Sequence, residues 1–130
     1  MKLLHFDHMQ LAMPPGGETE ARNFYVGVLR MRETPKPDVL AARGGCWFFA
    51  EEVQIHLGVD PDFRAARKAH PAIVVQNLAG FLDRCTHAGF PVEPGDPLGA
   101  YTRAFVFDPF GNRIELIEAA PPAADSAGLA

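Results

Sequence analysis

Hydrophobic and polar positions along the chain follow two periodicities, one typical of strands and one typical of helices. Short apolar or alternating runs predict strands over 8–13, 32–34, 46–49, 53–57, 70–75, 91–92, 101–107 and 113–117. Apolar residues that recur at helical spacing predict helices over 18–29 and 78–88. Gly89 stands where the second helix should end, and residues 108–112 contain Pro and Gly in positions that favour a turn.

These elements occur in the order βαβββ, and the order is found twice. Trp47-Phe48-Phe49 and Ile55-His56-Leu57 in the first half correspond to Phe105-Val106-Phe107 and Ile114-Glu115-Leu116 in the second. A repeat of this kind decides the fold. We therefore expect the α+β class, with units over about 5–59 and 70–118 in one domain spanning 1–118. Residues 119–130 are rich in Ala and Pro and are expected to be a disordered tail.

The repeat brings four possible metal ligands into matched positions. His8 opens the first unit and His70 opens the second, while His56 corresponds to Glu115. If the units pack about a pseudo-twofold axis, His8 faces His70 and His56 faces Glu115, and imidazole with carboxylate is a ligand mix that divalent metals accept. Taken singly, each of these residues is more simply explained as a surface or core side chain. Because their positions match in both units, the case that all four bind a metal becomes stronger. Gln54 shares a strand face with His56 and is the alternative fourth ligand.

Composition and charge narrow the classes of function. The chain has 130 residues, near the commonest size of one domain, and 48% of them are hydrophobic. A net charge of -4 without a basic stripe gives nucleic-acid binding little support. The first residues do not form a signal peptide, and no segment approaches the roughly 20 apolar residues of a membrane span. We therefore expect no membrane contact and a cytoplasmic location.

The remaining histidines and the cysteines have simpler interpretations. Cys46 and Cys85 are expected to be buried apolar residues, because one pair in a chain with its own core is not a disulfide scaffold. His5 and His87 have no partner in the repeat, and His87 lies late in a predicted helix, where a cation suits the helix dipole. We interpret both histidines as structural.

Four segments carry a resemblance to a known family. These segments are 6–11, 24–29, 70–75 and 108–116, and Asp-Pro-Phe-Gly-Asn followed by Arg-Ile-Glu is the most specific of them. They resemble the vicinal-oxygen-chelate superfamily of glyoxalases, bleomycin resistance proteins and extradiol dioxygenases, over nearly the whole chain except the tail. The resemblance implies an open, bowl-like mixed β-sheet around one divalent metal ion per site, which is Zn, Ni, Co, Mn or Fe. Its ligand positions match His8, His70 and Glu115.

The resemblance also implies a chemistry. Glyoxalase I has a fourth ligand, usually Glu or Gln, at the position of His56, and His56 is our expected fourth ligand. Glu115 is the only carboxylate of the set and would be the catalytic base. The implied activity is that of a glyoxalase-type lyase or isomerase, or of a thiol transferase that leaves His56 for the substrate, acting on a small molecule with vicinal oxygens. The alternatives are an extradiol dioxygenase and a non-catalytic drug- or metabolite-binding resistance protein, although bleomycin-binding relatives lack the three ligands.

Three further residues are candidates for substrate binding. Arg103 shares a strand face with Tyr101 and has the planar fork that suits carboxylate or phosphate. Trp47 could line an apolar wall of the pocket. The simpler interpretations are a solvated rim arginine and a tryptophan in the core. In relatives of this size two chains commonly pair, so the resemblance implies a homodimer in which each site takes residues from both chains.

Overall fold

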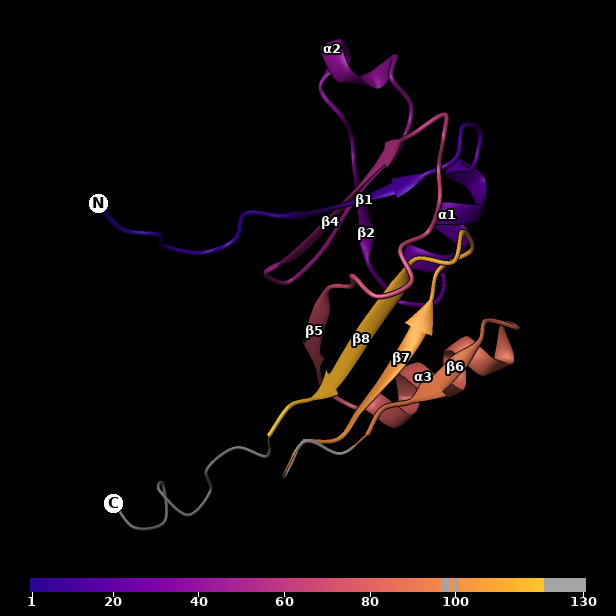
Figure 1. The fold of residues 1–130 in the computed structure, drawn as a ribbon. Coiled ribbons are helices and arrows are strands. Elements are labelled where there is room, and N and C mark those ends of the chain that lie inside the picture. Colours follow the sequence, from indigo (N-terminus) through magenta and orange to yellow (C-terminus); the bar gives the residue numbers. More distant parts are fainter. Residues whose placement is uncertain (97–98, 100, 121–130) are drawn as a thin grey trace.

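The computed structural model describes residues 1–96, 99 and 101–120, and contains two βαβββ units (Figure 1). The first unit consists of β1 (Met9–Met13), α1 (Glu18–Tyr25), β2 (Arg32–Thr34), a short helix α2 (Asp38–Ala41), β3 (Cys46–Ala50) and β4 (Val53–Val59). The second consists of β5 (Ala72–Val75), α3 (Leu78–His87), β6 (Val92–Pro94), β7 (Arg103–Phe107) and β8 (Arg113–Glu118). The predicted fold class and its duplicated unit are confirmed.

Each unit forms one four-stranded mixed sheet, and the two sheets have the same topology. Their strand orders are β1-β4-β3-β2 and β5-β8-β7-β6, so that β1 and β5 are edge strands. Gln10 pairs with His56 in the first sheet, as Ala72 pairs with Glu115 in the second. His8 precedes Gln10 by two residues, and His70 precedes Ala72 by two residues. The repeat read from the sequence is therefore also a repeat of strand register.

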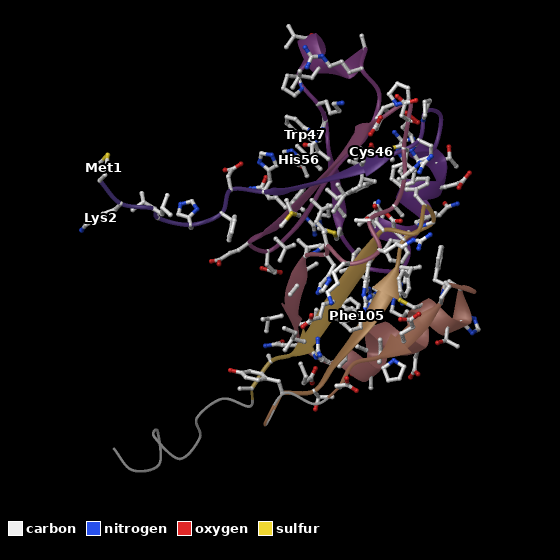
Figure 2. All side chains as sticks on the ribbon, in the orientation of Figure 1. Met1, Lys2, Cys46, Trp47, His56 and Phe105 are labelled. Atoms are coloured by element: carbon white, nitrogen blue, oxygen red, sulfur yellow. The ribbon has the colours of Figure 1, made fainter. Side chains whose placement is uncertain are left out.

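Alternation along the strands gives each sheet one face that packs into the hydrophobic core and an opposite face. The buried core includes Met13, Phe24, Tyr25, Phe48, Ile55, Leu57, Val106, Ile114 and Leu116. The side chains of neighbouring strand positions point the opposite way. We call this opposite side the open face, although His56, Phe105 and Glu115 on it are themselves buried. It carries Trp47 and His56 in the first sheet, and Arg103, Phe105 and Glu115 in the second. Figure 2 labels Trp47, His56 and Phe105 among them.

A buried polar clamp joins the two units. Asp108, at the turn between β7 and β8, accepts hydrogen bonds from the hydroxyl of Tyr25 at 2.7 Å and from Nδ2 of Asn112 at 2.8 Å. Nδ2 of Asn112 also donates to the carbonyl of Ala12 in β1 at 2.8 Å. Backbone N–H groups of Phe110 and Asn112 donate to the other oxygen of Asp108. The Asp-Pro-Phe-Gly-Asn segment thus has a structural role that explains its composition.

Both helices of the repeat begin where the pattern predicts, and they differ in where they end. The side chain of Asn77 accepts a hydrogen bond from the backbone N–H of Gly80 and caps α3. Gly89 follows α3 with φ +85°, a left-handed conformation that favours glycine, so the predicted stop is confirmed. The α1 helix ends at Tyr25 instead of residue 29, since the N–H groups of Val28 and Leu29 both turn back to the carbonyl of Phe24.

Three other differences from the pattern have local causes. The short α2 helix was not predicted because its four residues are fewer than a helical period can reveal. Strand β7 begins at Arg103, and Tyr101 precedes it with 58% of its surface exposed. The N–H of Ala119 donates to the carbonyl of Val75 at 2.7 Å, so the chain stays in sheet register up to that residue. The rest of the expected tail, 121–130, lies outside the described residues.

The cysteines lie where the composition suggested. Cys46 and Cys85 are both buried and free, and burial raises the pKa of each thiol to about 11. Both therefore behave as small apolar side chains. None of the helices in the part of the chain that the structure describes has the length and apolar content required to cross a bilayer.

Candidate metal centre

His70 and Glu115 form the best-defined part of the candidate site. Nε2 of His70 lies 3.0 Å from Oε1 of Glu115, whose side chain is only 9% exposed. Nδ1 of His70 lies 2.7 Å from the carbonyl oxygen of Lys68. Because a carbonyl only accepts, Nδ1 carries a proton, and in the neutral ring Nε2 presents a lone pair. Two acceptors then face each other, an arrangement that a proton or a metal cation between them would stabilise.

His8 is oriented in the same way on the first unit. Its Nδ1 lies 2.8 Å from the carboxylate of Asp7, so the proton is again held on Nδ1 and Nε2 is free to bind. The hydrogen bond from His8 lowers the pKa of Asp7. Both histidines thus have an outer oxygen partner of the kind that orients metal-binding imidazoles.

His56 lies between two aromatic rings. It stacks on His8 with ring centroids 4.0 Å apart and on Trp47 with centroids 4.1 Å apart, at interplanar angles of 17° and 7°. Burial lowers the pKa of His56, and the neighbouring His8 lowers it further. Both effects favour the neutral ring. The two stacks hold it in a fixed plane, with its edge as the part available to a ligand.

One chain places these side chains as two separate pairs. His8 and His56 belong to the first sheet, and His70 and Glu115 belong to the second. Within the described residues, which include all four, no three His, Cys, Asp or Glu side chains are close enough together to hold a metal ion. We call the two pairs half-sites. The four predicted ligands would form one set only if half-sites from different sheets came together.

Two arginines lie beside the Glu115 half-site. Nη1 of Arg103 lies 3.2 Å from Oε1 of Glu115, and the Arg103 side chain is only 16% exposed, so it is not a solvated rim arginine. Its Nε donates to the carbonyl of Asp96 at 2.9 Å. The guanidinium of Arg113 lies 3.9 Å from the ring centroid of Phe105, which His70 contacts edge-on. These contacts fix two cations on the open face of the second sheet.

Sequence reasoning missed Arg113, although a signal for it existed. Arg113 precedes Glu115 by two residues and so shares its face, as Gln54 does with His56. Its Nε is buried and has no hydrogen-bond partner among the described residues. Tyr101, by contrast, is mostly exposed, and the described contacts do not place it against the ligands.

Trp47 lines a cavity as well as stacking on His56. This cavity of about 330 Å³ is bordered by Gln10, Lys36, Leu40, Arg43, Gly44, Trp47, Leu57, Gly58 and Val59. Lys36 donates to the carbonyl of Gly44, beside α2. The cavity therefore combines an aromatic wall with two cationic side chains next to the first half-site, which supports the pocket interpretation of Trp47.

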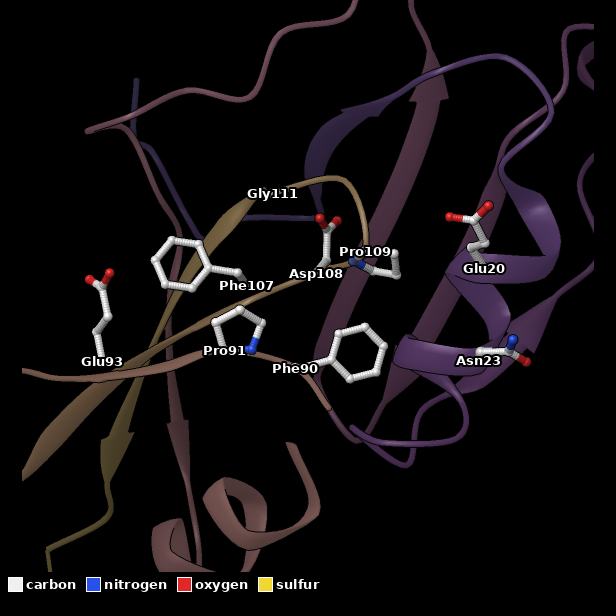
Figure 3. Close-up of a pocket in the computed structure, with 9 residues that line it drawn as sticks. All are labelled: Glu20, Asn23, Phe90, Pro91, Glu93, Phe107, Asp108, Pro109 and Gly111. Atoms are coloured by element: carbon white, nitrogen blue, oxygen red, sulfur yellow. The ribbon is translucent and has the colours of Figure 1, made fainter. Parts of the chain in front are cut away.

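A second cavity, of about 640 Å³, lies away from the half-sites. Figure 3 shows its lining, which comprises Glu20, Asn23, Phe90, Pro91, Glu93, Phe107, Asp108, Pro109 and Gly111. None of the four candidate ligands borders it. Asp108, its most buried carboxylate, is already occupied by the clamp. This cavity does not contribute to the candidate metal centre.

Comparison with known structures supports the fold. A protein from Bacillus anthracis assigned to the glyoxalase family is 41% identical, with a TM-score of 0.87, and the match covers 92% of this chain and 98% of that one. A fosfomycin resistance protein, FosX, from Listeria monocytogenes is 14% identical over 92% of this chain and 96% of that one, with a TM-score of 0.72. An antibiotic binding protein from Streptomyces sp. CB03234 is 17% identical over 92% and 99%, with a TM-score of 0.68.

The last two likenesses, below 25% identity, concern the fold alone. The chain matches none of the curated proteins with which we compared it. Its residues 6–116 match the family described as Glyoxalase/Bleomycin resistance protein/Dioxygenase superfamily. That match covers both βαβββ units, and it includes His8, His56, His70 and Glu115. The chain therefore belongs to the glyoxalase, bleomycin resistance protein and dioxygenase superfamily.

Proposed function

We propose that this protein is a metal-dependent enzyme that acts on a small molecule with vicinal oxygens. Its ligands for one divalent ion, Zn, Ni, Co, Mn or Fe, would be His8, His70 and Glu115, with His56 as the fourth. The observation that carries the proposal is the contact of 3.0 Å between Nε2 of His70 and Glu115, with Nδ1 of His70 committed to a backbone carbonyl. When bound, the metal would supply a Lewis acid to the two oxygens of the substrate.

The complete site would be shared between two copies of the chain. Each copy carries His8 on its first sheet and the His70–Glu115 pair on its second sheet. A symmetric homodimer brings the first half-site of one copy to the second half-site of the other, and it does so twice. The free edges of β1 and β5 favour such pairing. The cytoplasmic location expected from the sequence stays a prediction.

Glu115 would be the residue that moves a proton. It is the only carboxylate among the four proposed ligands, and Arg103 holds its Oε1 at 3.2 Å. The guanidinium would orient the carboxylate and bind an anionic group of the substrate. These roles suit a glyoxalase-type lyase or isomerase, or a thiol transferase. In the transferase, His56 would contact the substrate instead of the metal.

A non-catalytic binding protein is the second candidate function. The aromatic wall that Trp47 gives to the cavity on the first sheet supports it, since such walls are typical of small-molecule sites. A neighbour of the same fold is an antibiotic binding protein. An extradiol dioxygenase would use two histidines and one glutamate with iron or manganese, and would consume oxygen with a catechol.

Metal content tests the proposal directly. We expect about one divalent ion per chain by mass spectrometry of protein purified without an affinity tag, and its loss in His70→Ala and Glu115→Gln. His87→Ala is the matched control, because His87 has no role in the site. A protein that stays metal-free when metal is added would rule out the enzyme and favour the binding protein. Variants that keep the metal would contradict the ligand assignment.

A further inference from the structure

The cavity of about 640 Å³ is formed by parts of both units. Residues of α1, of the segment that leads into β6 and of the turn between β7 and β8 line it (Figure 3). None of the four candidate metal ligands borders it, and neither Arg103 nor Arg113 does. Sites for small molecules commonly have volumes of about 300–1,000 Å³. The cavity is therefore large enough for a ligand of its own, separate from the metal centre.

Flat apolar rings form the floor of this cavity. They belong to Phe90, Pro91, Phe107 and Pro109, and Figure 3 shows them between Glu93 on one side and α1 on the other. Phe90 also packs edge-on against the buried Phe24, with ring centroids 5.0 Å apart. Pro109 lies in the turn that the clamp holds. Part of the floor is thus ordered by contacts within the protein, which reduces the entropy that a ligand loses on binding.

Carboxylates surround the floor, and no cation of the lining balances them. Glu20 and Glu93 are exposed, and neither forms an ion pair with any described residue. Asp108 accepts hydrogen bonds from neutral donors alone, namely a hydroxyl, a side-chain amide and two backbone N–H groups. The described lining contains no Lys, Arg or His. Negative charge beside aromatic rings attracts a cation.

We propose that this cavity binds an organic cation, an ammonium or amidinium group carried on an apolar ring. A metal ion does not fit, since no three His, Cys, Asp or Glu side chains of the described residues are close enough together to hold one. The ring of the ligand would cover Phe90 and Phe107, while its charged group reaches Glu20 or Glu93. Because exposed carboxylates attract a cation only weakly in water, the apolar floor would supply most of the affinity.

Three molecules of one shape test the charge of the ligand. Benzamidine, benzamide and benzoate are positive, neutral and negative near neutral pH. Benzamidine should bind about tenfold more tightly than benzamide, and benzoate more weakly still. In two-dimensional NMR, benzamidine should shift the backbone amide signals of Asn23, Glu93 and Gly111, which line the cavity. Benzamidine that binds no more tightly than benzamide would overturn the proposal, and so would signals that shift at Glu115 instead of at the cavity.

Removal of the two exposed carboxylates tests their part in binding. Glu20→Gln with Glu93→Gln should weaken benzamidine binding by about tenfold. Glu51→Gln with Glu52→Gln removes the same charge at the exposed turn between β3 and β4, outside this cavity, and should leave the affinity unchanged. An equal effect of the two double variants would mean that benzamidine responds to net charge alone, which contradicts a site in the cavity.

A cation placed inside the cavity should exclude the ligand. Asn23 is an exposed residue of α1 that lines the cavity, and Asn23→Lys should abolish benzamidine binding. Thr19→Lys adds the same charge to the same helix outside the lining, and should bind benzamidine as the parent does. Undiminished binding by Asn23→Lys would reject the cavity.

The metal centre supplies the last control. His70→Ala removes a proposed metal ligand that does not border the cavity, so benzamidine should bind this variant with the affinity of the parent. Loss of benzamidine binding in His70→Ala would place the probe at the metal centre and overturn the separate site.

Discussion

Tyr25 donates its hydroxyl to Asp108 at 2.7 Å, across 83 positions of the chain, and so ties the first helix of one unit to the last turn of the other. Asp108 is 3% exposed and accepts four hydrogen bonds in all. A buried carboxylate is tolerated only where its oxygens are satisfied in this way. The clamp ties the two units to each other, although none of its hydrogen bonds involves a half-site residue.

Replacing this carboxylate by its amide should therefore destabilise the fold. In Asp108→Asn the new Nδ2 would face Nδ2 of Asn112, donor against donor, and at least one buried hydrogen bond would be lost. We expect the free energy of unfolding to fall by about 2–4 kcal/mol. Urea denaturation measures it, and the exposed Asp62→Asn should change it little. A variant at 108 as stable as the control would contradict the structural role of the clamp.

The same carboxyl group should make stability depend on pH. Burial raises the pKa of Asp108, and the hydrogen bonds from Asn112 and Tyr25 offset only part of that rise. A pKa higher in the folded than in the unfolded chain favours the folded state at low pH. This contribution is complete below pH 3.8, the ordinary pKa of an aspartate side chain, and is lost as the pH rises through the folded-state pKa.

Denaturation of the parent and of Asp108→Asn over a pH series isolates this effect. The stability advantage of the parent should shrink from pH 3.8 upward, and become constant once Asp108 is ionised. An advantage that grows over the same range would mean that the clamp lowers the pKa of Asp108 and that the sign is wrong.

The fold was more predictable from the sequence than the site. The repeat fixed the register, because Ile55-His56-Leu57 and Ile114-Glu115-Leu116 alternate in the same phase. Side-chain conformations, in contrast, depend on contacts between strands. The stack of Trp47 on His56 and that of Arg113 on Phe105 involve residues brought together by pairing of β3 with β4 and of β7 with β8. No local pattern contains them.

The sequence pattern of one chain could not predict that the two half-sites are separate. A pseudo-twofold axis explains why His8 and His70 are equivalent, but it does not say whether equivalent residues meet within a chain or between chains. Whether they meet within or between chains depends on how the two sheets pack. Because β1 and β5 are edge strands, a second copy of the chain could pack against them. The implied sharing of the site between copies stays a prediction.

Arg103 offers a test of substrate binding. Arg103→Met removes the guanidinium 3.2 Å from Glu115 while keeping an apolar stem over Phe105. We expect metal content to be retained and kcat/KM for an anionic substrate to fall by about 10- to 150-fold, the loss of one charged hydrogen bond. Arg30→Met, at an exposed loop position, should have no effect. Loss of the metal in Arg103→Met would assign this residue to the metal site instead of to the substrate.

Trp47 provides the test of His56. It is the single tryptophan of the chain, so tryptophan fluorescence reports on the surroundings of this one residue, which include its stack with His56. If His56 is the fourth ligand, adding Zn²⁺ to metal-free protein should change the emission of Trp47, because binding withdraws electron density from the stacked ring. His56→Gln should reduce that change without abolishing metal uptake by the other three ligands. If Zn²⁺ binds and the emission is unchanged, while a substrate or anion alters it, His56 contacts the substrate and the site has three ligands.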